Sequence, residues 1–169
     1  KETDPPANGP DLIRREIELN LVLDCLLWRG SALYDRLYRK GLIDDSFAAS
    51  YSTTPTFGAS SLGGETDDPA ALEAELAAGI SRFLRDGIRR RELDRIKRKY
   101  LGHFLRGFDS VDQCAFTLLR FWFKHFDVFE LPKLVRHVTA TALARTARRH
   151  LREEARAVSL VEPSKAAGS

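Results

Sequence analysis

Hydrophobic residues recur every three or four positions in six stretches of the chain, which is the spacing of one helix face. The first stretch is the clearest, because Ile13, Ile17 and Leu21 are four residues apart and Gly30 ends it. The pattern predicts helices over residues 11–28, 32–40, 69–86, 90–106, 111–126 and from 140 onward, with a short segment near 129–138.

Polar residues that can cap a helix stand before five of these stretches, where a side-chain oxygen can accept a bond from a free backbone N–H. The expected N-caps are Asp11, Ser31, Asp68, Thr139 and Ser110, the last in a capping box with Gln113. In the short second helix we expect Leu33, Tyr34, Leu37 and Tyr38 to point inward. The fifth helix ends in the aromatic cluster Phe121, Trp122, Phe123 and Phe126. We expect a large aromatic interior in the domain, and an apolar surface on the aromatic-rich helical layer that a missing half covers.

The hydrophobic period changes to two in residues 47–53 and 57–64, with a turn around Pro55 between them. Alternation of this kind predicts a β-hairpin. Residues 157–161 read as a further strand. The fold class is therefore α+β, an antiparallel sheet packed by several helices. Three strands are few for so many helices, so we expect further strands upstream of Lys1 or on a partner.

The ends of the chain differ in composition from the rest. Residues 1–10 hold three of the seven prolines and no apolar pattern, which predicts a linker or disordered end. One domain is expected over residues 11–163, followed by a polar tail over 164–169. Because the chain begins at Lys1 and contains no Met, we expect it to be a piece of a longer product.

Composition narrows the class of protein. The 169 residues are 43% hydrophobic and 30% charged, with a net charge of +3, as in ordinary globular domains. No apolar run approaches the roughly 18 residues of a membrane helix, so no membrane partner is expected. Two cysteines, Cys25 and Cys114, form no disulfide framework and look like small buried hydrophobes. A cytoplasmic location is expected.

Local motifs give no sign of catalysis. The histidines are His103, His125, His137 and His150, and neither HxxxH nor HxxEH occurs, so we expect no metal and no catalytic residue in this chain. Gly63-Gly64 invites a phosphate-loop reading, but the carboxylates of residues 65–68 would repel a phosphate. A strand end followed by a helix N-cap explains these glycines better.

Basic residues cluster in residues 89–99 and again near 145–152. In the first cluster Arg91, Arg95 and Arg98 lie opposite the apolar stripe, where a solvated face belongs. A nucleic-acid-binding module is therefore a weaker alternative, since no aromatic residue interleaves these cations and no binding motif is present. No nucleic-acid partner is expected.

Four stretches together resemble one family. They are SALYDRLYRKGLIDDSFAASY (31–51), FGASSLGGETDDP (57–69), ELDRIKRKYLGHFLRGFDS (92–110) and AVSLVEP (157–163). In this order and spacing they resemble the C-terminal half of insulinase/pitrilysin-type zinc metallopeptidases, close to bacterial processing-peptidase-like members. The resemblance covers roughly residues 12–163 and implies a metalloprotease-like half-domain of the LuxS/processing-peptidase type.

This resemblance implies a division of labour. Two related α+β halves close like a clamshell, and the zinc motif HxxEH belongs to the N-terminal half. The C-terminal half binds no metal, closes over the substrate chamber and shapes peptide binding. Implied partners are the N-terminal half of the same protein or a paralogous subunit, and a peptide substrate; the fragment alone could form a homo-oligomer. The alternative is a structural or partner subunit from an inactive member of the family.

The resemblance also implies a substrate-binding position. Active members supply an Arg and a Tyr in a pattern like L-R-x-x-x-G-L-x-Y, which Gly41 and Leu42 anchor here. Asp44 stands at the Tyr position, and Tyr38, or Leu37 without a gap, at the Arg position. Arg39 or Lys40 could supply the charge. The expected substrate-binding residues are Tyr38, Arg39 and Asp44.

Overall fold

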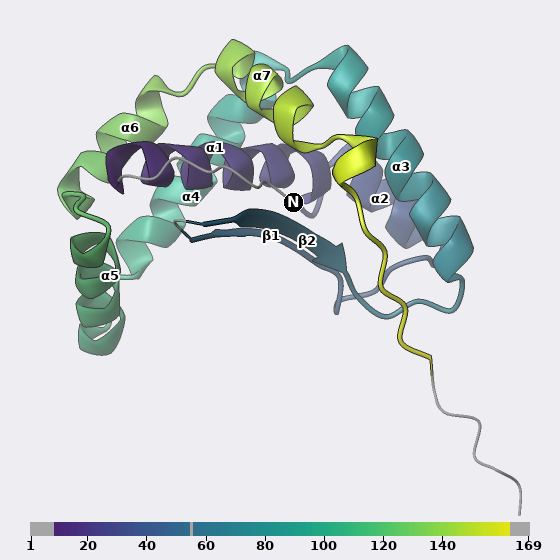
Figure 1. Ribbon diagram of the computed structural model, residues 1–169, viewed down its shortest axis with the longest axis horizontal. Helices are drawn as coiled ribbons and strands as arrows, with labels where there is room; N and C mark the ends of the chain where they lie inside the picture. The colour runs from purple at the N-terminus through teal and green to yellow at the C-terminus, as the bar shows by residue number, and fades with distance from the viewer. Residues whose placement is uncertain (1–8, 55, 163–169) are drawn as a thin grey trace, which may run out of the picture.

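A computed structural model describes residues 9–54 and 56–162 of the chain, which form a mostly helical α+β domain (Figure 1). The elements in order are α1 (Gly9–Leu27), α2 (Ala32–Arg39), β1 (Ala48–Thr53), β2 (Gly58–Gly63), α3 (Pro69–Asp86), α4 (Arg90–Arg106), α5 (Val111–Phe123), the 3-10 turn η1 (Val128–Glu130), α6 (Leu131–His137), α7 (Ala140–His150) and the 3-10 turn η2 (Glu153–Ala155). The predicted fold class, helices and hairpin are confirmed.

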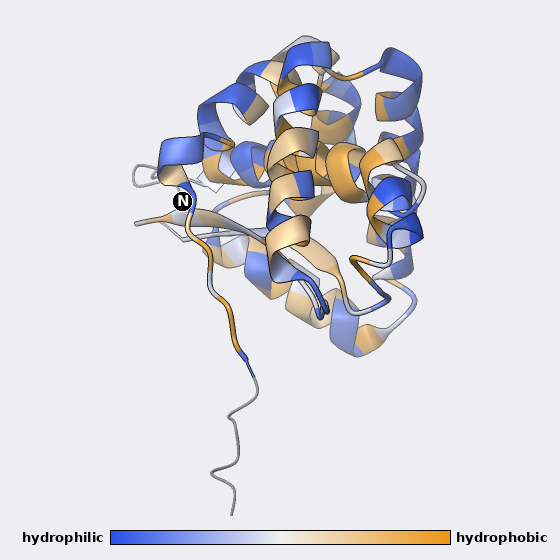
Figure 2. Cartoon of the chain, turned by 90° about the vertical axis from the view of Figure 1, so that its right-hand side faces the viewer, coloured by the Kyte–Doolittle hydropathy of each residue, from blue (hydrophilic) through white to orange (hydrophobic). Residues whose placement is uncertain are grey.

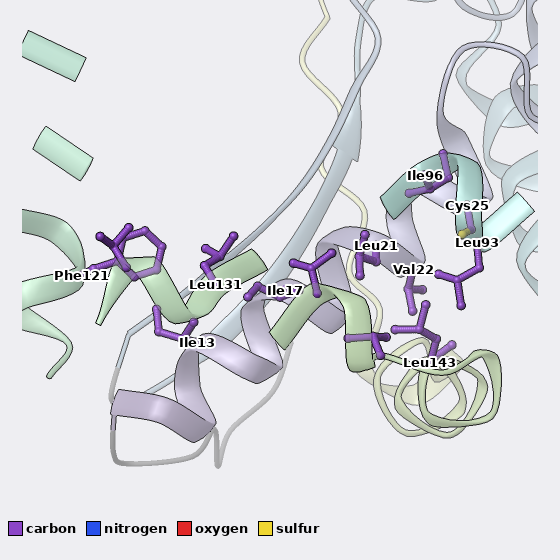
Figure 3. Packing of buried hydrophobic residues seen from close by; sticks show 14 residues of the cluster. Ile13, Ile17, Leu21, Val22, Cys25, Leu93, Ile96, Phe121, Leu131 and Leu143 are labelled. Carbon is purple, nitrogen blue, oxygen red and sulfur yellow. The ribbon is translucent and has the colours of Figure 1, made fainter. Parts of the chain in front are cut away.

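Helix α1 is the centre of the domain, with the hairpin on one side and α7 on the other (Figure 1). Its fully buried Ile13, Ile17 and Leu21 pack among Leu131 of α6 and Leu143 of α7 (Figure 3). A different face of α1 carries residues that pack on the hairpin. The helix is therefore buried on more than one side, and twelve of its nineteen residues are buried.

A second hydrophobic cluster holds α2 and α3 against the start of the hairpin. Leu33 and Leu37 of α2 pack there with Phe47 before β1 and Leu72 of α3. Helix α3 approaches α2 closely at Gly79, where a Cβ atom would overlap the side chain of Leu33. The loop that enters β1 is thus anchored from both helices.

The hairpin is a two-stranded antiparallel sheet in which Ala48 pairs with Gly63 and Thr53 with Gly58. Tyr51 is buried against Leu19 and Leu23 of α1, and Ala49 and Leu62 pack beside it. The alternate positions of β1 are Ala48, Ser50 and Ser52, which are all exposed. The alternation seen in the sequence therefore corresponds to one buried and one exposed face. Pro55, at the expected turn, lies outside the described residues.

Three of the five expected caps form side-chain bonds. The side chains of Ser31, Asp68 and Thr139 accept from the N–H groups of Tyr34 (3.2 Å), Ala71 (3.0 Å) and Ala142 (3.1 Å).

Two caps differ from expectation. The N-cap prediction at Asp11 is wrong, because α1 already begins at Gly9 and Pro10 fits its first turn. Ser110 precedes α5 as predicted, but its side chain makes no capping bond, so the capping box is absent. The remaining residues of the expected linker, 1–8, lie outside the described part of the chain.

The third strand is not formed. Residues 157–161 are extended but pair with no strand in the described part of the chain, and Figure 2 shows this segment leaving the body of the domain. Val158, Leu160 and Val161 are exposed, Val161 at 91%. Alternating hydrophobicity makes a segment able to pair, but a strand needs a neighbour, and the described residues offer none here.

The expected aromatic interior is confirmed only in part, because most of the aromatic cluster at the end of α5 lies on the surface. Phe121 is buried, but Trp122 and Phe123 are 75% and 76% exposed, and Phe116 is exposed as well. Helix α5 stands at the margin of the domain beside α4 (Figure 1), so only one side of it meets other elements. Leu105 of α4 is exposed too. The basic face of α4 is exposed as predicted, at Arg91, Arg95 and Arg98.

Candidate functional site

The segment that follows α2 carries all three expected substrate-binding residues. Helix α2 ends where Gly41 adopts φ +66°, a left-handed conformation that favours glycine. The N–H of Gly41 donates to the carbonyl of Tyr38 (3.0 Å), and that of Leu42 to the carbonyl of Leu37 (3.0 Å). These bonds reverse the chain at once and direct it through Asp44 into β1.

Tyr38 lies on the outside of this turn. Its side chain is 55% exposed, so the expectation that it points inward is wrong. The ring stacks on that of Tyr34, with 6.3 Å between centroids and 11° between planes. Tyr34 is buried and one helical turn earlier, so it takes the inward position and leaves Tyr38 to cover it. The Tyr38 ring is therefore held against Tyr34 while much of its surface stays exposed.

Arg39 and Lys40 have different partners. The Arg39 guanidinium pairs with Asp35 one turn earlier (2.8 Å), and both side chains are exposed. The Lys40 ammonium pairs with Glu75 of α3 (2.6 Å). The hydrogen bond from Lys40 lowers the pKa of the Glu75 carboxyl. Lys40 thus ties α2 to α3, whereas the exposed ion pair of Arg39 holds it weakly and can exchange.

Asp44 is fixed by its own turn. Its carboxylate accepts from the Ser46 hydroxyl (2.5 Å) and from the Ser46 N–H (2.8 Å). These bonds lower the pKa of Asp44, the hydroxyl bond most, so the side chain is anionic at neutral pH. Ser46 Oγ in turn accepts from the N–H of Glu65 (2.9 Å), which joins the entry of β1 to the exit of β2.

The three expected residues lie on one turn but are not linked to each other. Among the bonds formed by the described residues, none joins Tyr38, Arg39 and Asp44. Together they present an aromatic ring, a cation and an anion at exposed positions. Such a surface can bind a peptide backbone or charged side chains.

A cavity of about 340 Å³ lies between α1, α2, the start of β1 and α4. Its lining includes Tyr34, Phe47 and Lys99. The Lys99 ammonium donates to Asp24 (2.7 Å) and stands 3.2 Å from the centroid of the Trp28 ring. The sequence analysis missed this cluster. Asp24 and Lys99 are 75 residues apart, so no local motif could have revealed them.

The described residues do not form a metal centre. No group of three or more His, Cys, Asp or Glu side chains among them is placed to hold a metal ion. Burial raises the pKa of the Cys25 thiol to about 12, so it is neutral and unreactive at physiological pH. Cys114 is half-buried on α5. Of the described helices, none is long and apolar enough to cross a membrane.

The α+β fold is accompanied by a match to a known protein family. Residues 6–100 match the family model described as the peptidase M16 inactive domain. This match covers more than half of the chain, and the chain belongs to this family.

Most of the chain is similar to a curated bacterial protein. It is 29% identical over 141 residues to the uncharacterized zinc protease YmfH of Bacillus subtilis strain 168, covering 82% of this chain and 32% of YmfH. It therefore spans about a third of that relative's length.

Solved structures share the fold. A crystal structure of an M16-like peptidase from Alicyclobacillus acidocaldarius has a TM-score of 0.85 at 24% identity, covering 90% of this chain and 37% of that one. A zinc protease from Bordetella pertussis Tohama I has a TM-score of 0.65 at 20% identity, covering 90% and 85% of the two chains. These identities support a shared fold.

Proposed function

We propose that this chain is the C-terminal, non-metal-binding domain of an insulinase-type zinc peptidase. It closes over the substrate chamber and shapes peptide binding, while zinc and the HxxEH motif belong to the N-terminal half. The match to the M16 inactive domain carries this proposal. The length of YmfH, of which this chain covers 32%, is consistent with a further domain in the whole protein.

We further propose that Tyr38, Arg39 and Asp44 contact the peptide. Their exposure and their position at the reversal after α2 support this role. The weakly held Arg39 can exchange Asp35 for a substrate carboxylate, and the anionic Asp44 can accept from a peptide N–H or a cationic side chain.

The proposed partner is the N-terminal half of the same polypeptide or a paralogous subunit. The exposed apolar residues of α5, which include Phe116 and Trp122, support such a contact, because large uncovered apolar patches are unusual on monomers. Without its partner the fragment is expected to self-associate, which light scattering measures. The two free cysteines are consistent with the proposed cytoplasmic location.

The main test uses the whole protein that contains this chain. We expect one zinc ion per polypeptide by atomic emission, and hydrolysis of fluorescence-quenched peptides that a chelator abolishes. Replacing the Glu of HxxEH in the N-terminal half by Gln should stop hydrolysis. A whole protein that lacks HxxEH and zinc would instead be an inactive partner subunit, and the proposal would fail.

The residue assignment has a separate test. The double variant Arg39→Ala/Asp44→Ala should lower kcat/KM about tenfold, or about 1.4 kcal/mol, without changing the melting temperature. The matched control is Arg85→Ala/Asp86→Ala, another exposed charged pair, on α3. Unchanged kinetics would make Arg39 and Asp44 ordinary surface residues, and a loss of stability would make them structural.

A further inference from the structure

Two independent hydrogen bonds show which residues of β1 direct their backbone N–H and carbonyl groups away from β2, toward the outer edge of the hairpin. The N–H of Thr54 donates to the carbonyl of Phe57 (2.8 Å) and closes the hairpin turn. Because bonded and non-bonded pairs alternate in an antiparallel ladder, Thr53, Tyr51 and Ala49 direct their backbone groups away from β2. The N–H of Tyr51 agrees with this assignment, since it donates to the side chain of Asn20 on α1 (3.3 Å) and not to β2.

Asn20 covers one position of this edge, and no bond from elsewhere in the described part of the chain occupies the backbone groups of the next one, Ala49. Its Nδ2 donates to the carbonyl of Glu16 (2.9 Å), which holds the Oδ1 toward Tyr51. Two residues earlier, Ala49 directs its N–H and carbonyl to the same side, and the 340 Å³ cavity opens there. Ala48 and Ala49 line the cavity, and no residue of the described β2 does. The cavity therefore lies along the outer edge of β1.

The residues that line the cavity favour one kind of ligand side chain. They include two cations, Arg29 and Lys99, and one carboxylate, Asp24. The Arg29 guanidinium pairs with Asp45 (2.8 Å), so Lys99 is the cation that can meet an acidic ligand. An ammonium group has three donors. For Lys99, Asp24 takes one and the Trp28 ring another, which leaves a third for a ligand. The aromatic side chains of Tyr34 and Phe47 supply an apolar wall.

We propose that this edge binds an extended peptide. The peptide adds to β1 as a strand at Ala49 and inserts an acidic side chain, with an apolar stem, toward Lys99. Strand addition gives affinity through the backbone, and the cavity gives selectivity through the side chain. This inference rests on the proposed function and assigns its substrate class as peptides with an acidic residue in an extended segment.

Binding to the whole protein tests this proposal by fluorescence anisotropy, separately from hydrolysis. The probe is a labelled, C-terminally amidated decapeptide with one central Glu, and its partner peptide carries Gln instead. We expect the Glu peptide to bind about tenfold more tightly than the Gln peptide, as for one charge-assisted hydrogen bond. Lys99→Gln should remove this preference, and Lys99→Arg should restore part of it. The control Lys97→Gln changes a neighbouring lysine whose ammonium donates to the carbonyl of Arg136 and should have no effect.

A second variant tests whether the peptide pairs with the backbone of β1. Ala49→Pro removes an N–H that points away from β2, so it should weaken both peptides about tenfold and leave the hairpin intact. Ala49→Ser keeps the N–H and should bind normally. If Ala49→Pro lowers the melting temperature, a peptide with N-methylated backbone amides serves in its place and should bind about tenfold more weakly to the unchanged protein.

The outcomes separate the two proposals. Hydrolysis without a Glu preference, or with binding insensitive to backbone methylation, overturns this inference and leaves the proposed function standing. Lys99-dependent binding of the Glu peptide without any hydrolysis supports this inference and counts against the proposed function. If a Gln peptide with a free C-terminus binds as tightly as the Glu peptide, the cavity takes a chain terminus, and the side-chain assignment is wrong.

Discussion

Helices α1 and α5 are both rich in hydrophobic residues, but the domain uses them differently. Twelve of nineteen residues are buried in α1, whereas Phe121 is the one buried residue among the thirteen of α5. Helix α1 is covered by the hairpin, α4 and α7, and α5 stands at the margin of the domain (Figure 1). The hydrophobic content of a helix therefore predicts that its apolar face has to be buried. The position of the helix in the fold decides whether other elements of this chain bury that face.

The largest expected effect comes from matched truncations in the two helices. Leu21→Ala in α1 removes a fully buried side chain and should lower the free energy of unfolding by about 3 kcal/mol. Leu119→Ala in α5 removes an exposed side chain and should change it by less than about 0.5 kcal/mol. Urea denaturation of both variants measures the difference. Equal losses would mean that α5 is as well packed as α1.

Alkaline pH should weaken the α1 side of the domain. Burial raises the pKa of Cys25 from 9.0 to about 12, and it also raises that of Tyr100 to about 12. A raised pKa in the folded state stabilises it below the unfolded value, and this stability is lost as the pH rises from about 9 to about 12. At about pH 10.5 the cysteine accounts for about 2 kcal/mol. Cys25→Ala should remove that part of the pH dependence, measured by denaturation between pH 8 and pH 10.5.

The connection between the two helices can be broken by itself. The buried carboxylate of Glu16 on α1 pairs with Arg120 and with Lys124 (2.6 Å), which follows α5. Glu16→Ala leaves these two neighbouring cations without their carboxylate partner and should lower the free energy of unfolding by about 1.5 kcal/mol. This loss is smaller than for a fully buried pair because Arg120 is largely exposed. Hydrogen exchange should rise in α5 before α1. Glu130→Ala, which removes an exposed pair with Lys133, should leave exchange unchanged.

The smallest expected effect is at the turn before β1. Ser46 lowers the pKa of Asp44 through its hydroxyl and its N–H, so this carboxylate favours the folded state above its ordinary pKa and loses the effect as pH falls through the lowered value. Asp44 is exposed, and Ser46→Ala should move its titration midpoint upward with little change in melting temperature. Carbon-detected NMR titration of the carboxyl group measures this shift. If the midpoint does not move, the Ser46 hydroxyl is not the group that lowers the pKa of Asp44.

The sequence was sufficient at three helix starts and at the hairpin, where local chemistry decides the structure. Ser31, Asp68 and Thr139 cap their helices as predicted, and the alternation around Tyr51 places the hairpin correctly. Residues 157–161 and Trp122 were misread because pairing and burial depend on neighbours that a pattern does not contain.

The candidate site also has one part that the sequence predicts and one part that it does not. Gly41 marked the turn that carries Tyr38, Arg39 and Asp44, since a left-handed residue leaves a local signal. The group of Asp24, Trp28 and Lys99 left none, because α1 and α4 meet only after folding. Tertiary contacts of this kind cannot be inferred from spacing along the chain.

Gly9 has a consequence for comparing sequences within the family. A Cβ atom at this position would overlap the carbonyl of Lys124, so the start of α1 and the residue after α5 meet backbone to backbone. Any side chain at position 9 would force the two segments apart. In an alignment of relatives, a glycine in this column should therefore mark the lineages whose α5 docks in the same orientation. In lineages with a bulkier residue at this position, we expect α5 to lie farther from the start of α1 or to be shorter.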